Sequence, residues 1–75
     1  KDINGNAINS EYSICEDTEG CLLITKDTGK LIAVKGLKNY MVIDTEDGLL
    51  VCPKDEKSFK DVISAMAMPK FDRFK

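Results

Sequence analysis

The sequence predicts a mainly β domain of short strands, followed by one C-terminal amphipathic α-helix. Four aliphatic segments recur at regular distances, because their centres at Leu23, Ala33, Val42 and Val51 are 10, 9 and 9 residues apart. Regular spacing of about 8–12 residues, with turn residues in between, is typical of a sandwich, a meander or a solenoid. After Pro53, which cannot donate to a strand ladder, the apolar residues take up a helical period instead.

The strands are expected where aliphatic residues are bounded by turn formers. Residues 1–10 are turn-rich, since Asn4-Gly5 is a strong turn dipeptide. The Asp27-Thr28-Gly29 segment and residues 44–48 break the later aliphatic runs. The expected strands are residues 12–15, 21–25, 30–35, 40–44 and 49–52.

Two of these segments carry no polar residue at alternate positions. Residues 22–24 and 49–51 are continuously apolar, which indicates burial on both faces of the strand. A chain this short has only its final helix to cover a second face. We therefore expect another domain or another subunit to cover the rest.

The helix is expected over about residues 55–67, with a tail over 69–75. Asp55 suits the N-cap position, and Ser58, three residues before Asp61, is a competing start. Pro69 ends the helix within one or two residues. An apolar stripe at positions i, i+3, i+4 and i+7 runs along it, formed by Phe59, Val62, Ile63 and Met66.

Length and composition restrict the chain to one small domain over residues 1–75. Its 8.3 kDa leave a marginal core unless the domain is stapled or assembled, and Lys1 in place of Met suggests a piece of something longer. The formal charge of −2 argues against nucleic acid as a partner. Apolar runs of about five residues are far below the roughly 20 that span a bilayer, so no membrane partner is expected.

The cysteines and the missing histidines argue against a metal site or a catalytic centre. Cys15, Cys21 and Cys52 are odd in number and lack the spacing of a zinc site, so they are expected to be buried or half-buried thiols in a reducing cytoplasm. The sequence has no histidine and no phosphate-binding glycine loop. We expect no catalytic, cofactor-binding or metal-binding residue, and regard Lys35, Lys38 and Lys54 as solvated rather than as phosphate contacts.

The residues expected to matter are therefore packing and assembly residues, whose role is to bury surface. On the strands and the helix they are Leu22, Ile24, Leu31, Ala33, Val42, Leu49, Val51, Phe59, Val62, Ile63 and Met66.

One stretch of the chain resembles a known family. Gly36-Leu37-Lys38-Asn39 precedes the aliphatic strand at 40–44, residues 47–51 read D-x-L-L-V, and Lys54-Asp55 leads to the amphipathic helix. This order, specific over residues 36–66 and extending weakly over 1–68, is similar to the C-terminal region of mannose-1-phosphate guanylyltransferase. The resemblance implies a β-helix-like or solenoid-like arrangement of the strands.

The resemblance also implies what the parent protein does. A mannose-1-phosphate guanylyltransferase converts GTP and mannose 1-phosphate to GDP-mannose and pyrophosphate, with Mg²⁺, on an N-terminal nucleotidyltransferase domain. That domain's glycine-rich signature loop matches nothing in this chain, so no catalytic residue carries over and both substrates would bind outside it. The implied role is a non-catalytic domain that supports homo-oligomeric assembly and braces the catalytic domain, in the cytoplasm.

Two other classes of function are weighed against this role. The first is a stand-alone β-rich module that binds a carbohydrate, or a peptide added to a sheet edge. The second is a small independent enzyme, which would need a pocket of about 300 Å³ or more that a domain of this size rarely encloses.

Overall fold

The computed structural model describes residues 2–74, with side chains described for residues 2–71, and it is a short β-solenoid extended by a hairpin strand and a helix. The elements are β1 (Ala7–Ile8), β2 (Tyr12–Glu16), β3 (Leu22–Thr25), β4 (Leu31–Lys35), β5 (Tyr40–Asp44), β6 (Leu49–Pro53), α1 (Glu56–Met66) and the 3-10 helix η1 (Pro69–Phe74). The mainly β class with one long helix is confirmed. Strand β1, in the segment expected to be only turn-rich, was missed.

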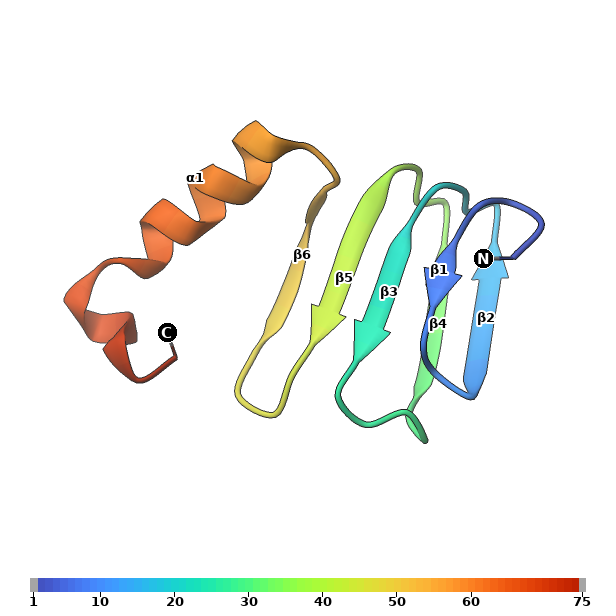
Figure 1. Cartoon of the computed structure of the whole chain (residues 1–75), viewed down its shortest axis with the longest axis horizontal. Coiled ribbons are helices and arrows are strands. Elements are labelled where there is room, and N and C mark those ends of the chain that lie inside the picture. Colours follow the sequence, from blue (N-terminus) through green and yellow to red (C-terminus); the bar gives the residue numbers. More distant parts are fainter. Residues whose placement is uncertain (1, 75) are drawn as a thin grey trace.

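The strands form two sheets that the chain visits in turn (Figure 1). The first sheet has the order β1-β3-β5-β6, with β1, β3 and β5 parallel and β6 antiparallel to β5. The second sheet contains only β2 and β4, which are parallel. One coil of the solenoid therefore consists of one strand from each sheet, β1 with β2 and then β3 with β4. The third coil has β5 but, among the described residues, no strand of the second sheet.

The repeat of the solenoid is 19 residues. Tyr12 pairs with Leu31 and Leu22 pairs with Met41, and the same offset of 19 holds along both ladders. It also holds at the isolated bridge between Glu19 and Lys38. The spacing of 9 or 10 residues in the sequence is thus half a coil, the distance from a strand in one sheet to the next strand in the other.

The corners of the coils are built by residues that tolerate a positive φ. Gly5, Gly20 and Asn39 stack at one corner with φ of 79°, 65° and 57°. A Cβ on Gly20 would collide with Oδ1 of Asn39, so this position needs glycine for both its backbone angle and its space. The neighbouring corner position repeats the pattern, with Asp17 at 50° and Gly36 at 77°.

The core lies between the two sheets. Cys21 and Leu23 are fully buried and Ile32 nearly so, and half-buried side chains such as Val34 and Val42 pack against them. Because side chains alternate along a strand, this places Leu23 and Ile32 inside and their neighbours outside.

Buried polar side chains complete the interior, and each has partners. Asn6 is fully buried: its Oδ1 accepts from the Cys21 amide at 2.9 Å, and its Nδ2 donates to the Thr18 carbonyl at 3.0 Å. Its Nδ2 also donates to Oδ2 of Asp2, which helps to lower the pKa of that carboxyl. The side chain thereby continues the strand ladder where the backbone turns the corner.

Helix α1 begins where its capping chemistry places it. Asp55 is the N-cap, and its Oδ1 accepts from the Ser58 amide at 2.7 Å. This contact and the Ser58 hydroxyl lower the pKa of Asp55. Asp55 rather than Ser58 is thus the start. No residue of α1 is fully buried, and none of the helices in the described part of the chain has the length and apolar character needed to cross a bilayer.

Candidate functional site

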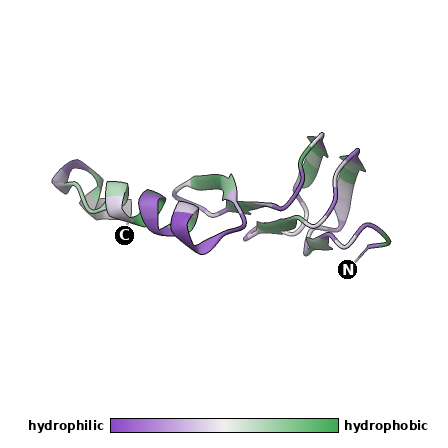
Figure 2. Ribbon diagram, turned by 90° about the horizontal axis from the view of Figure 1, so that it is seen from above, coloured by the Kyte–Doolittle hydropathy of each residue, from purple (hydrophilic) through white to green (hydrophobic). Residues whose placement is uncertain are grey.

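The candidate site is the open side of the solenoid, where the first sheet extends beyond the second. Val51 on β6 pairs with Val42 on β5, and cross-strand partners share a face, so Val51 faces the same interior as Val42. Leu49 faces the same way two residues earlier. Yet Leu49 is 65% exposed and Val51 51% exposed. Figure 2 shows the second sheet lying over only part of the first.

A second apolar surface lies on the outer face of the β2–β4 sheet. Tyr12 stands beside Leu31 and Ile14 beside Ala33 in the parallel ladder, and all four side chains are exposed. At the end of this face, Glu16 and Lys35 form an ion pair with an N–O distance of 3.6 Å. The face therefore presents an apolar centre with a charged end.

An apolar groove of about 540 Å³ lies between the β5–β6 hairpin and the C-terminal helices. It is on the outer face of the first sheet, since Ile43 and Leu50 are cross-strand partners in it. The helical side of the groove comes from Val62, Ile63, Met66 and Phe71.

The predicted packing residues are divided between these surfaces. Half-buried in the chain are Leu22, Ile24, Val42, Val62 and Met66. Exposed in the chain are Leu31, Ala33, Leu49, Val51, Phe59 and Ile63. The exposed set therefore does not form the core of this chain, and its expected role in assembly stays a prediction.

The residues that do form the core occupy the alternate positions, and sequence reasoning missed them. On β3 and β4 the buried residues are Leu23 and Ile32, one position away from those expected. A shift of one residue moves a side chain to the opposite face of a strand, and continuously apolar runs do not reveal which face is inside. The 19-residue repeat would have given the phase, because Thr25 and Asp44 occupy equivalent positions in it.

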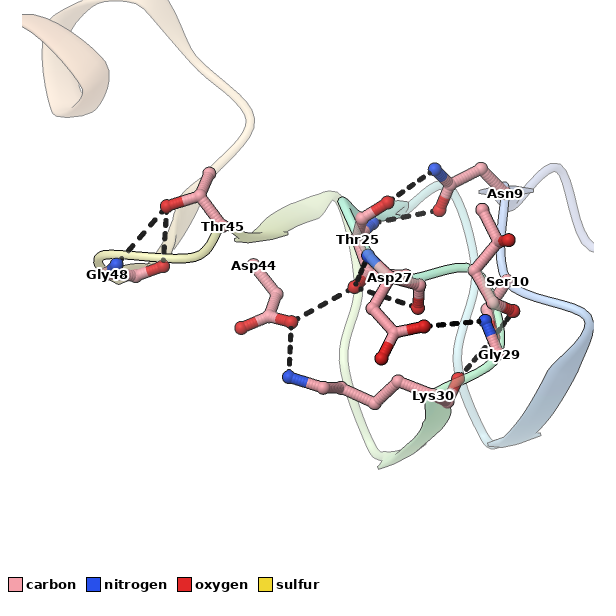
Figure 3. A network of polar contacts seen from close by, with 10 residues as sticks. Asn9, Ser10, Thr25, Asp27, Gly29, Lys30, Asp44, Thr45 and Gly48 are labelled. Carbon is pink, nitrogen blue, oxygen red and sulfur yellow. Dashed lines mark hydrogen bonds and ion pairs between the residues drawn. The ribbon is translucent and has the colours of Figure 1, made fainter.

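A polar network closes the opposite corner of the coils (Figure 3). The side chain of Asn9 exchanges two hydrogen bonds with the backbone of Thr25, at 2.7 and 2.8 Å. The Thr25 hydroxyl donates to Oδ2 of Asp44 at 3.0 Å, and Lys30 Nζ donates to the same oxygen at 2.7 Å. The Lys30 contact, and then that of Thr25, lower the pKa of Asp44, and the same ion pair raises the pKa of Lys30.

The corner also encloses a cavity of about 220 Å³, which has little capacity for a ligand. Its cations are already paired, Lys30 with Asp44 and Lys26 with Glu46 at 3.3 Å. Ligand pockets usually measure about 300–1,000 Å³. We interpret this corner as a structural network.

The lysines weighed as phosphate contacts have partners inside the chain. Lys35 pairs with Glu16, Lys38 pairs with Glu19 at 3.8 Å, and Lys54 Nζ donates to the Gly20 carbonyl at 3.1 Å. These contacts supply no convergent phosphate site.

The thiols and acids do not gather into a metal-binding set. Cys21 and Cys52 are buried and Cys15 is half-buried, all three as free thiols, and burial raises the pKa of Cys15. Within the described part of the chain, no three His, Cys, Asp or Glu side chains lie together so that they could hold a metal ion. The Mg²⁺ that the family resemblance implies therefore does not fit the residues of this domain.

Comparison with known proteins connects this geometry to a domain family. A family model described as the MannoseP isomerase/GMP-like beta-helix domain matches residues 12–65. The alginate biosynthesis protein AlgA of Pseudomonas fluorescens is 33% identical over 67 residues, which are 88% of this chain and 13% of that protein. AlgA of Pseudomonas putida is 34% identical over 56 residues, or 75% of this chain and 11% of that protein.

A solved structure has the same architecture. The crystal structure titled mannose-1-phosphate geranyltransferase from Thermus thermophilus aligns with a TM-score of 0.64 and 25% identity. The alignment covers 88% of this chain and 20% of that chain. The chain thus spans only a small part of each of these proteins.

Proposed function

This chain belongs to the MannoseP isomerase/GMP-like beta-helix domain family, and from that premise we propose that it is the non-catalytic β-helix domain at the C-terminus of a mannose-1-phosphate guanylyltransferase. The parent protein would convert GTP and mannose 1-phosphate to GDP-mannose and pyrophosphate in the cytoplasm. GTP, mannose 1-phosphate and Mg²⁺ would bind to the parent's N-terminal nucleotidyltransferase domain.

The division between an active body and this domain is supported by two observations. The matched relatives are several times longer than the matched segment, since it makes up 13% of one and 20% of another. Among residues 2–74, no metal-binding set is assembled, and the sequence contains no histidine. The domain is therefore assigned support rather than chemistry.

The observation that carries the support role is the open side of the solenoid at Leu49 and Val51. The chain exposes 5371 Å², whereas a compact protein of 8.3 kDa exposes about 4,600 Å². Its radius of gyration of 13.2 Å also exceeds the roughly 11 Å of a compact chain of this length. The excess surface is comparable to the roughly 800 Å² that one partner buries in a standard interface. We assign this surface to contact with the catalytic body and to self-association.

The test compares the isolated chain with the full-length parent. The isolated chain should show no guanylyl transfer from GTP to mannose 1-phosphate, whereas the parent should be active. In the parent, the double substitution Leu49→Ser, Val51→Ser should lower the temperature of inactivation, because it places hydroxyls in the contact. Lys57→Ser with Lys60→Ser on the solvent face of α1 is the matched control. Turnover by the isolated chain at constant purity contradicts the proposal.

The alternative, a stand-alone module for a carbohydrate or a peptide, makes a different prediction. It requires a monomer at all concentrations and a site of its own, and the polar corner cavity is small for that purpose. Sedimentation of the isolated chain at several concentrations separates the two functions. Self-association supports the assembly role, and a clean monomer that binds mannose oligosaccharides supports the module.

A further inference from the structure

The second sheet ends at an edge whose backbone groups point into open space. The Gly36 amide donates to the Glu16 carbonyl at 2.9 Å, so at this position β4 turns its N–H toward β2. Backbone N–H groups alternate in direction along a strand, and the β2–β4 register is constant over five residue pairs. The amides of Leu31, Ala33 and Lys35 therefore point to the other edge of β4, where no described strand pairs with them.

This edge lies beside the open interior of the third coil. The chain winds from β3 with β4 to β5, so the free edge of β4 is on the side where β5 and β6 extend the first sheet (Figures 1 and 2). Opposite that position, Leu49 and Val51 face the interior and are exposed by more than half. An unpaired ladder and an uncovered apolar face thus mark the same place, which is the size of one missing strand.

The two features specify the chemistry of an occupant. Its backbone must be extended over about the five residues of β4, since the ladder offers that length. Its inward side chains, at alternate positions, must be apolar because they would contact Leu49, Val51 and Val42. A charged side chain at these positions would be buried without a partner.

The occupant must also be tethered. A free strand of five residues would lose about 1–2 kcal/mol of backbone entropy for each residue it orders, and would also lose translational freedom. A segment of the same polypeptide avoids most of the second cost, because its effective concentration is in the millimolar range. The relatives have ample polypeptide of this kind, since more than four fifths of each lies outside the matched segment.

We infer that an extended segment of the parent polypeptide, from outside residues 1–75, adds to the free edge of β4 and completes the third coil. The inference rests on the proposed function only for the source of this strand. It adds to that function a specific mode of attachment, which is strand addition rather than packing of preformed surfaces.

The test is residue-resolved amide hydrogen exchange in the isolated chain and in the full-length parent. In the isolated chain, the amides of Leu31, Ala33 and Lys35 should exchange nearly as fast as in an unfolded peptide. In the parent they should slow by ~100-fold or more, because they donate to the added strand. The amides of Ile32 and Val34, which point to β2, serve as internal references in both.

Two proline substitutions separate strand addition from simple covering by another body. Ala33→Pro removes an outward amide of β4 and should abolish the protection of Leu31 and Lys35 in the parent. Ser13→Pro removes an amide at the outer edge of β2, which also points away from the ladder, and should leave that protection intact. Protection that survives Ala33→Pro overturns the inference.

The remaining outcomes are also decisive. Fast exchange of these amides in an active parent overturns strand addition and leaves the guanylyltransferase function standing. Protection in a parent that makes no GDP-mannose overturns that function and supports the added strand. Concentration-dependent protection in the isolated chain identifies a second copy as the occupant and overturns the tethered segment.

Discussion

The two halves of this molecule have similar aliphatic strands but differ in how those strands are buried. In the half formed by β1 to β4, two sheets face each other, Cys21 and Leu23 are 0% exposed, and Asn6 has partners for its amide. In the half formed by β5, β6 and α1, the strands have no opposing sheet among the described residues, and Leu49 is 65% exposed. Burial is therefore a property of the opposing layer, and apolar sequence alone does not provide it.

The largest effect is expected at the centre of the closed half. Leu23→Ala should lower the free energy of unfolding of the isolated chain by about 2–5 kcal/mol, because it leaves a cavity between two packed sheets. Leu22→Ala, on the outer face of the same strand, is the matched control and should cost less. The measurement is the urea midpoint followed by circular dichroism. Equal losses for the two variants would show that the solenoid interior is not the core.

The next effect is expected at the buried amide of Asn6. Asn6→Ala leaves the Cys21 amide and the Thr18 carbonyl without their side-chain partners and should cost about 1–3 kcal/mol. Asn4→Ala is the control, because Asn4 is exposed in the same turn. Chemical denaturation of the three proteins at neutral pH measures the difference. An unchanged midpoint for Asn6→Ala would mean that water replaces the side chain at this corner.

A smaller effect concerns acid stability at the polar corner. The pKa of Asp44 is lower in the folded chain than its ordinary value of 3.8, so the unfolded state binds more protons over the interval between the two. The carboxylate thus stabilises the fold above about pH 4, and this contribution is lost as the pH falls through the folded pKa. Asp44→Asn should flatten the stability profile below pH 4 without abolishing its slope, since Asp2 and Asp55 also have lowered pKa values.

The control for the acid profile is Glu46→Gln. The ion pair that Glu46 makes with Lys26 is exposed on both sides, with 70% and 77% of the side chains accessible, so its loss should change stability little. Thermal unfolding between pH 2 and 6 gives the three profiles. Identical slopes for the wild-type chain and Asp44→Asn would remove the carboxylate from the acid response.

The smallest effect in the isolated chain is expected in the open half. Leu49→Ala should change the unfolding free energy by no more than about 0.5 kcal/mol, because most of this side chain is already in water. The same substitution in the full-length parent should cost more, since the proposed contact buries Leu49 there. Melting temperatures of both pairs make the comparison. A large loss in the isolated chain would assign Leu49 to its own core and would close the distinction between the halves.

Local features of the sequence predicted most of the elements but not their inner faces. Strands 40–44 and 49–52 were placed to within a residue of β5 and β6, because aliphatic runs between turn formers have little alternative. Strand β1 was missed because Ala7–Ile8 is too short to show a period. The open side of the solenoid was anticipated only in the need for something to cover the apolar strands.

The sequence by itself determined where the chain turns, where the helix begins and which segments extend, because these depend on local chemistry such as the positive φ of Gly20 or the capping carboxylate of Asp55. The tertiary structure decided which face of each strand is inside, since a run such as residues 22–24 offers apolar side chains to both faces. It also decided that β6 returns antiparallel and leaves the edge of β4 unpaired. Both choices depend on contacts between residues 19 or more apart, and no local preference encodes them.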